Sequence, residues 1–143
     1  MEKHSYRTGV QWVNERRATL NGDGLPTLEV ATPPEFPGGH AGIWSPEHLF
    51  TAAAEACLMT TFLAIAANSK LEFKAYSSTA EGVLEKTEAG FLMTEIVLRP
   101  RVVVTTAEHV ERTRRVLEKA EKHCLISNSM KTRVTLEPEV VVG

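Results

Sequence analysis

Residues 49–67 constrain the fold more than any other part of the chain, because they form a helical pattern that is apolar on almost every side. The apolar residues that cannot share one helical face are Leu49, Phe50, Ala53, Cys57, Leu58, Phe62, Ile65 and Ala66. A helix that is hydrophobic all round must be covered on all sides. A chain of 143 residues can supply a sheet for one side but not enough cover for the other. The pattern therefore indicates a second subunit against this helix.

The residues around this stretch predict where the helix begins and ends. Ser45 suits the N-cap, Pro46 suits the first helical position, and Glu47 complements the positive end of the helix dipole. No breaker follows before Asn68 and Ser69. We expect one helix about 34 Å long at 1.5 Å per residue.

The same stretch does not have the composition of a membrane span. Glu55 lies inside it, and many of its positions are Ala where a span would carry Leu and Ile. The N-terminal residues 1–4 are too polar for a signal peptide. We expect a cytoplasmic protein with no membrane partner.

Short strands are predicted before this helix and longer strands after it. The expected strands are residues 5–12, 17–20, 27–32, 75–85, 91–104 and 132–142. Asn-Gly and Asp-Gly at residues 21–24 predict a tight turn, and residues 87–90 join the two long strands. Residues 33–39 contain three prolines and two glycines, so we expect an ordered loop there.

A second helix is predicted from the capping-box pattern of Thr105 and Glu108. Its expected buried stripe is Val110, Thr113, Leu117, Ala120 and Cys124. A short helical turn or loop follows at residues 125–130. The order of strands, helix, strands, helix and strand indicates one α+β domain, residues 1–143, with antiparallel sheets.

Charge and motif content exclude several functional classes. A net charge of −2 and a pI near 6.2 give no reason to expect a nucleic-acid partner. The five histidines show none of the paired spacings of a zinc site. No serine lies in a nucleophile elbow, and Gly38-Gly39 is too short for a phosphate cradle. Metal-dependent, hydrolase and nucleotide-binding activities are therefore not expected.

Cys57 and Cys124 are the two cysteines of the chain. Because the cytosol keeps most thiols reduced, the two cysteines are expected to be redox-active, metal-binding or simply buried rather than joined in a permanent structural disulfide. Either cysteine, taken alone, is more readily explained as a small buried hydrophobe. Two helices packed on each other can bring the sulfurs within bridging distance, with Cα atoms about 4.4–6.8 Å apart.

Three segments resemble the signature blocks of the OsmC/Ohr family, which contains osmotically inducible protein C and organic hydroperoxide resistance protein. These segments are residues 32–39 (TPPEFPGG), 45–57 (SPEHLFTAAAEAC) and 124–130 (CLISNSM). The resemblance runs from Val10 to Val142 with the blocks in the right order. It implies an OsmC-like α+β fold, in which sheets wrap around two long central helices of an intertwined homodimer.

The resemblance also implies a thiol peroxidase that reduces organic hydroperoxides. Cys57 takes the place of the peroxidatic cysteine, Cys124 that of the resolving cysteine, and Glu47 that of a glutamate that positions an arginine. In this mechanism Cys57 becomes a sulfenic acid, Cys124 condenses with it to a disulfide, and an external dithiol restores both thiols. The implied chemistry needs no metal, haem or flavin cofactor.

The chain departs from the family pattern at the arginine. A peroxidatic thiol needs a nearby cation that favours its thiolate and polarises the peroxide. The loop at residues 38–44 contains no arginine, and Arg16 and Arg17 are displaced from the family position by several residues. They are more readily explained as surface charges on a strand, and His40 is a further candidate whose charge near pH 7 is partial. Without a cation, burial is expected to raise the pKa of Cys57.

Two hypotheses therefore remain open on the sequence. One is the peroxidase, and the other is a non-catalytic dimeric stress or hydrophobic-ligand-binding protein that kept the thiols and lost the arginine. Ten residues separate Glu47 from Cys57, a rise of about 15 Å along one helix. A site containing both must therefore combine two chains, although a carboxylate at the helix start also satisfies the helix dipole.

Overall fold

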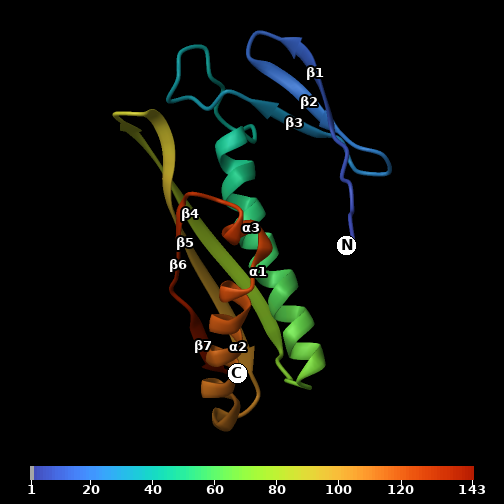
Figure 1. Ribbon diagram of the computed structural model, residues 1–143, viewed down its shortest axis with the longest axis vertical. Helices are drawn as coiled ribbons and strands as arrows, with labels where there is room; N and C mark the ends of the chain where they lie inside the picture. Colours follow the sequence, from blue (N-terminus) through green and yellow to red (C-terminus); the bar gives the residue numbers. More distant parts are fainter. Residues whose placement is uncertain (1) are drawn as a thin grey trace. The chain divides into compact units, whose positions relative to one another are not determined.

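The computed structural model describes residues 2–143, which form two compact units. One unit ends at Leu49 and the other begins at Phe50. In Figure 1 the strands of the first unit are blue, and the second unit runs from green to red. The thiols lie in the second unit, so its packing decides their environment.

The N-terminal unit contains a three-stranded antiparallel sheet. Its strands, in the order β1-β2-β3, are β1 (Gly9–Asn14), β2 (Arg17–Asn21) and β3 (Leu28–Ala31). The first strand begins later than residue 5, where it was predicted. A tight turn joins β1 to β2 through Glu15, whose φ is 47°. The turn predicted at residues 21–24 is present one residue later, since the N–H of Leu25 donates to the carbonyl of Gly22 at 3.0 Å and Gly24 has a φ of 73°. Because Leu20 pairs with Leu28, this turn lies within a longer loop between β2 and β3.

The Pro- and Gly-rich segment after β3 is an ordered loop, as predicted. The N–H of Gly39 donates to the carbonyl of Phe36 at 3.0 Å, and the N–H of His40 donates to the carbonyl of Thr32 at 2.9 Å. A Cβ on Gly39 would lie 1.9 Å from the carbonyl oxygen of Pro33, so only glycine fits this position. The loop is therefore closed on itself by its own backbone.

Helix α1 (Pro46–Asn68) has the predicted bounds. Ser45 is buried and caps the helix, since its Oγ accepts a hydrogen bond from the N–H of His48 at 3.2 Å. Glu47 stands in the first turn. The prediction of one uninterrupted helix carrying both Glu47 and Cys57 is confirmed.

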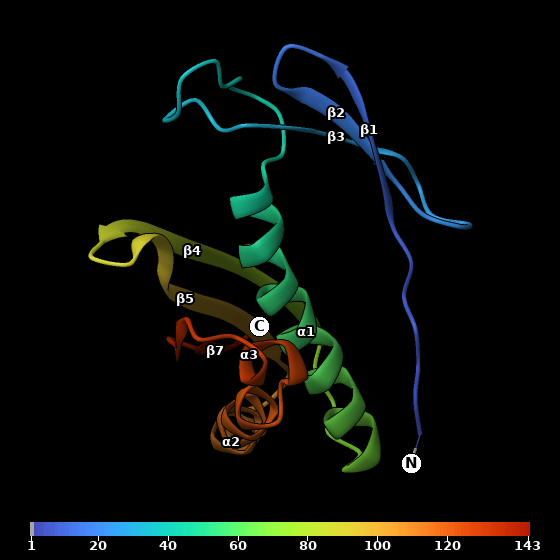
Figure 2. The ribbon, with the colours of Figure 1, turned by 45° about the horizontal axis from the view of Figure 1, so that its top comes forward.

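The C-terminal unit is a sheet of four strands with helices packed against it (Figure 2). Strand β4 (Ala75–Thr87) pairs antiparallel with β5 (Gly90–Val104), as predicted. The last predicted strand is two strands, β6 (Arg133–Leu136) and β7 (Glu139–Val142), because Pro138 cannot donate to the ladder. Both pair parallel with β5, so the predicted all-antiparallel arrangement is wrong. The helical crossover between β5 and β6 returns the chain in the same direction, which permits parallel pairing.

That crossover begins with the 3-10 turn η1 (Ala107–His109), which leads into α2 (Val110–Lys122) and then α3 (Leu125–Asn128). The predicted capping box is wrong, because η1 precedes α2 and neither N-cap residue makes a side-chain cap. The core side of α2 is Thr113, Val116, Leu117 and Ala120. Cys124 is buried as predicted, but it follows α2 and stands at the N-cap of α3.

One face of α1 packs into the core of the C-terminal unit. Its buried residues are Ala54, Leu58, Phe62 and Ala66, at four-residue steps. The ring of Phe62 contacts those of Phe73 and Tyr76, with centroids 5.3 and 5.2 Å apart. Although α1 is long and apolar enough to cross a membrane, this buried stripe makes it a core helix.

Apolar side chains on another side of α1 stay exposed within the chain. Met59 is 37% exposed and Leu63 is 40% exposed. The chain thus covers one side of the helix and leaves the other open, as the sequence pattern predicts.

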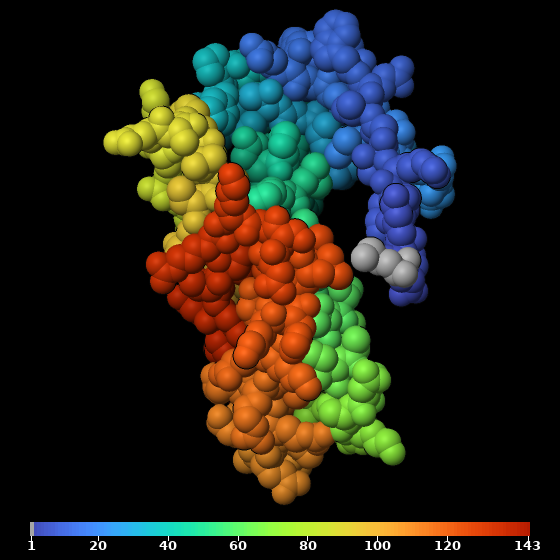
Figure 3. All heavy atoms as spheres, in the orientation of Figure 1, coloured from blue at the N-terminus to red at the C-terminus, as the bar shows by residue number. Residues whose placement is uncertain are grey.

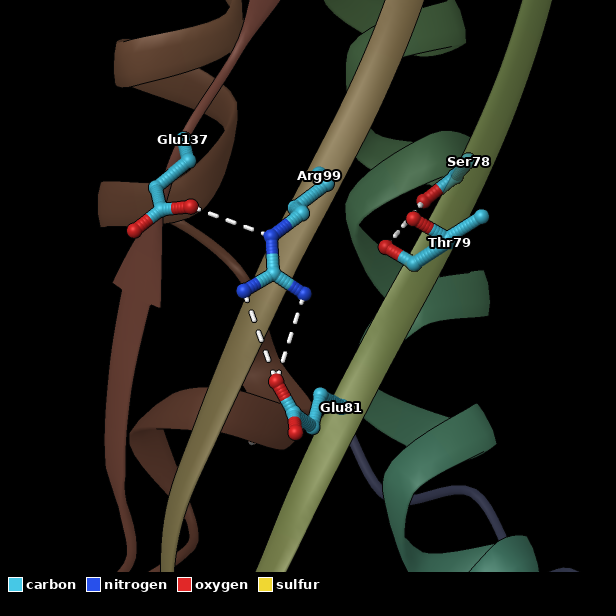
Figure 4. A network of polar contacts seen from close by, with 5 residues as sticks. All are labelled: Ser78, Thr79, Glu81, Arg99 and Glu137. Carbon is cyan, nitrogen blue, oxygen red and sulfur yellow. Dashed lines mark hydrogen bonds and ion pairs between the residues drawn. The ribbon is translucent and has the colours of Figure 1, made fainter.

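The face of the sheet away from the helices is polar. Arg99 on β5 donates to Glu137 at 3.0 Å and to Glu81 of β4 at 3.4 Å (Figure 4). These groups are exposed, so the pairs contribute little to stability. They link β4, β5 and the residue that follows β6, which leaves the helical face of the sheet for the core.

Gly82 on β4 leaves room for a side chain of α1 beside the sheet. A Cβ at this position would lie 2.1 Å from the Oγ1 of Thr51 and 2.8 Å from the Cε of Met93. Thr51 is on α1, six residues before Cys57. The absence of a side chain at Gly82 therefore helps to set the distance between α1 and the sheet. This distance also affects the position of the Cys57 thiol on α1.

We expect Gly82→Ala to lower the free energy of unfolding by about 1–3 kcal/mol, because the added methyl group overpacks this contact. Denaturant unfolding followed by circular dichroism measures the change. Thr51→Ala removes the nearest atom, so the double variant should recover part of the loss relative to Thr51→Ala alone. An unfolding curve unchanged by Gly82→Ala would contradict the tight approach.

Candidate functional site

Cys57 and Cys124 meet inside the C-terminal unit. Cys57 is half-buried on α1, and Cys124 is fully buried directly before α3. Figures 1 and 2 both place α3 beside the middle of α1. In Figure 3 the orange and red atoms of this region lie against the green atoms of α1. Both cysteines are free thiols, and their sulfurs are within hydrogen-bonding reach of each other.

The backbone at the start of α3 produces this contact. Cys124 is extended, with φ −68° and ψ 109°, so the chain turns from the end of α2 into α3 at this residue. The N–H groups of Leu125 and Ile126 are then directed at the sulfur of Cys57. The carbonyl of Cys124 accepts from the N–H of Asn128 at 3.0 Å, which closes the single turn of α3.

Several hydrogen bonds favour the thiolate of Cys57. Burial raises the pKa of Cys57, but donors from Ile126 N–H, the Cys124 thiol, the Thr61 hydroxyl and Leu125 N–H outweigh it and lower the pKa below the ordinary thiol value. The Oγ1 of Thr61 lies 3.9 Å from the sulfur. The pKa of Cys57 is therefore shifted in the direction opposite to the one that burial alone predicts. The groups that lower it are neutral hydrogen-bond donors rather than a guanidinium.

Cys124 is shifted the other way. Burial raises the pKa of Cys124, and proximity to the Cys57 sulfur raises it further, although hydrogen bonds from Ser127 oppose both. The Oγ of Ser127 donates to the sulfur of Cys124 at 3.4 Å. The site therefore holds one accessible thiol poised to ionise and one buried thiol that keeps its proton. That is the arrangement that an attacking thiol and a resolving thiol require.

Glu121 and Ser127 beside Cys124 were not identified from the sequence, nor was Tyr76, on which the charge of Glu121 acts. Burial raises the pKa of Glu121, and a hydrogen bond from Ser127 partly offsets the rise. Burial also raises the pKa of Tyr76, and the charges of Glu55 and Glu121 add to that rise. Glu121 and Ser127 lie three residues before and after Cys124, so helical spacing from the cysteine could have identified them.

The other predicted site residues belong to the N-terminal unit. Arg17 pairs with Glu29 across the sheet at 2.9 Å. Arg16 lies along the Pro- and Gly-rich loop, since a Cβ on Gly38 would be 3.2 Å from its Cγ. Glu47 stands in the first turn of α1.

His40, the further candidate for a cation, pairs with Glu15 through Nε2 at 3.4 Å. The described residues contain no cluster of three or more histidine, cysteine or acidic side chains that could hold a metal ion. The contacts of the two thiols therefore supply the chemistry of the site within the C-terminal unit.

Comparison with known proteins gives a family match over most of the chain. Residues 39–139 match the family model described as OsmC-like protein. The chain is 28% identical over 93 residues to the protein named peroxiredoxin OsmC of Escherichia coli, an alignment that covers 65% of this chain and 64% of that one.

Two solved structures share the fold along the whole chain. An OsmC-like protein of unknown function from Vibrio cholerae is 27% identical, with a TM-score of 0.85, covering 95% of this chain and 99% of the other. A protein from Legionella pneumophila, described as an organic hydroperoxide resistance protein OsmC, is 25% identical, with a TM-score of 0.76, covering 100% and 99%.

We expect the two thiols to titrate in separate ranges. Alkylation of Cys57 by iodoacetamide should rise with pH and reach half its maximum below the ordinary thiol pKa of about 8.5, because the hydrogen bonds favour the thiolate. Cys124 should react more slowly and at higher pH. Mass spectrometry of each cysteine peptide across a pH series measures both. Half-maximal alkylation of Cys57 above about pH 9 would contradict the direction of its shift.

Proposed function

Since the chain belongs to the OsmC-like protein family, we propose that it is a thiol peroxidase that reduces organic hydroperoxides with Cys57 and Cys124. The observation that carries the proposal is the contact between two free thiols whose pKa values are shifted in opposite directions. The redox names of its relatives, peroxiredoxin and organic hydroperoxide resistance protein, support the same chemistry.

In the first step the Cys57 thiolate attacks the outer oxygen of the hydroperoxide. The O–O bond breaks, an alcohol leaves after taking up a proton, and Cys57 becomes a sulfenic acid. Cys124 then attacks the sulfenic sulfur, water leaves, and the disulfide forms. An external dithiol reduces the disulfide by two exchange steps and is itself oxidised.

The hydrogen bonds around Cys57 have a direct role in this cycle. The N–H groups of Leu125 and Ile126 and the hydroxyl of Thr61 hold negative charge on the sulfur. They belong to the backbone and to α1, so their positions are fixed before the peroxide binds. These donors therefore need little rearrangement when the thiolate attacks the peroxide.

Arg16 and Arg17 are the proposed sources of positive charge for the peroxide, with Glu47 of the partner chain holding the guanidinium by a bidentate pair. Residues 10 positions apart on α1 lie about 15 Å apart along its axis, which favours a contribution from two chains. The Nε of Arg17 is buried and has no hydrogen-bond partner, so this side chain retains a donor for another group.

A homodimer completes the proposal. The apolar side chains of α1 that remain exposed, Met59 and Leu63, fit an interface with a second copy. Strand β1 also exposes Val10 and Trp12. We propose one OsmC-like domain over residues 1–143, acting as an intertwined cytoplasmic dimer with an external dithiol as reductant.

Turnover of cumene hydroperoxide with dihydrolipoamide tests the activity. Wild-type protein should consume the peroxide catalytically, and Cys57→Ser should lose at least about a hundredfold because the nucleophile is gone. Cys124→Ser should still oxidise once, leaving a Cys57 sulfenic acid that dimedone traps. Peroxide loss is followed by its absorbance or by a ferrous-oxidation assay.

Wild-type turnover no faster than that of Cys57→Ser would contradict the peroxidase and favour the non-catalytic dimer. Arg16→Ala and Arg17→Ala, measured beside it, separate the roles of the two arginines. The arginine that serves the peroxide should slow Cys57 oxidation when replaced, whereas the other variant provides the matched control.

The dimer is tested by placing a charge on the exposed side of α1. We expect wild-type protein to be a dimer at micromolar concentration with an apolar interface above about 2,000 Å². Leu63→Glu should shift it toward the monomer, because an unpaired carboxylate in that interface is costly. Light scattering coupled to size exclusion measures the mass, with the exposed sheet variant Lys86→Glu as control. A monomeric wild type would contradict the proposal.

A further inference from the structure

The Ser127 hydroxyl is a polar neighbour of the Cys124 thiol. The side chain of Cys124 is 0% exposed, and the Oγ of Ser127 lies 3.4 Å from its sulfur. The N–H of Cys124 donates to the carbonyl of Glu121 at 3.2 Å. The thiol is therefore enclosed between the last turn of α2 and the single turn of α3.

The Glu121 carboxyl faces the same interior. Its Oε2 is buried and has no hydrogen-bond partner, while the Ser127 hydroxyl is close enough to stabilise its ionised form. The charge of Glu121 also acts on Tyr76 of β4 and helps to raise its pKa, and the Tyr76 hydroxyl is buried and without a hydrogen-bond partner. Ser127 thus contacts a buried thiol and acts on a half-buried carboxyl group that has one buried oxygen.

We propose that Ser127 and Glu121 form a proton relay for Cys124 when the disulfide closes, an inference that rests on the proposed function. The Cys124 thiol passes its proton to the Ser127 oxygen while the Ser127 hydroxyl proton moves to the Glu121 carboxylate. The Cys124 sulfur attacks Cys57 at the same time, forming the S–S bond and breaking the S–O bond. The departing hydroxide leaves as water after taking up a proton. Ser127 touches the reacting sulfur, and Glu121 acts through it.

The relay meets a physical need of this site. A thiol must lose its proton to attack, and burial disfavours the free thiolate of Cys124. Because this sulfur has no exposed surface, bulk water cannot take the proton directly. A hydroxyl can rotate to accept from the thiol and donate to a carboxylate, which Ser127 is placed to do. The raised pKa of Glu121 makes its carboxylate a stronger base than an exposed one.

The other titratable groups around the relay give the opposite effect. Cys57 faces Cys124 from α1, and Tyr76 of β4 is acted on by the charges of Glu121 and of Glu55 on α1. Each can contribute only neutral or negative charge. Glu121, if it were a bystander, would also disfavour the Cys124 thiolate, so its removal would speed disulfide closure. If Glu121 is part of the relay, its removal should instead slow disulfide closure. The direction of the rate change therefore distinguishes the relay from a bystander role.

A mixed disulfide isolates the closure step from any peroxide. Dithiobis(nitrobenzoate) should react first at the accessible Cys57 and release one nitrothiobenzoate. Cys124 then attacks this mixed disulfide, the new S–S bond forms, and the second nitrothiobenzoate leaves as a thiolate. Stopped-flow absorbance of the reduced protein, from about pH 4.5 to pH 10, follows the second release.

At neutral pH we expect Glu121→Gln and Ser127→Ala each to slow the second release by about tenfold or more. The wild-type rate should show a limb that follows Glu121 ionisation, which both variants lose. Above the pKa of Cys124 the rates should converge, because hydroxide then removes the proton. Ser127→Thr keeps the hydroxyl and should restore most of the rate. Matched controls are Glu118→Gln on the exposed side of α2 and Ser129→Ala beyond Ser127.

A faster or unchanged second release in Glu121→Gln at neutral pH would overturn the relay, as would a slowing that persists equally at high pH. The first release reports the Cys57 thiol and should be the same in all variants, which shows that the site is folded. Because no peroxide is present, a protein without peroxidase turnover can still show the relay. A working peroxidase can equally lack it, so failure of one proposal is distinguishable from failure of the other.

Discussion

The contact between the start of α3 and the middle of α1 is the interaction on which the site depends. Two backbone N–H groups, from Leu125 and Ile126, reach the sulfur of Cys57 only because the chain becomes extended at Cys124. The same extended residue places its own thiol against that sulfur. One local conformation therefore both stabilises a thiolate and delivers its partner. The rest of the C-terminal unit holds the two elements at this separation, through the stripe of α1 on the sheet and the close approach at Gly82.

The long helix shows which parts of the fold can be predicted from sequence. Ser45, Pro46 and the breakers after Ala67 are local signals, and the observed bounds of α1 match them. Apolar periodicity likewise identifies the β4–β5 hairpin. The parallel pairing of β6 and β7 depends on where the chain returns after α2, which no local pattern records. The capping-box pattern at Thr105 and Glu108 fails for a related reason, since a 3-10 turn there is set by the route from β5 to α2.

In the candidate site, too, some features follow from local sequence patterns and others depend on the three-dimensional arrangement. A helical stripe indicates that Cys124 is buried, and the family blocks pair it with Cys57. The sign of the Cys57 shift could not be predicted, because it depends on N–H groups that belong to no particular residue type. A search limited to charged residues therefore looks for an arginine and overlooks the backbone donors. Ser127 and Glu121 were also overlooked, although their three-residue spacing from Cys124 is visible in the sequence.

The pKa shifts of the two thiols are linked by their contact. Burial is the largest cause of the raised pKa of Cys124, and the thiol proton that stabilises the Cys57 thiolate is itself held by this contact. Favouring attack thus makes resolution harder, since Cys124 must give up a proton that the resting site helps it to keep. Oxidation of Cys57 to a neutral sulfenic acid removes the negative charge that raises the pKa of Cys124. The first step of the proposed cycle therefore lowers the barrier to the second, and the half-buried Ser127 and Glu121 provide the remaining proton path in the proposed relay.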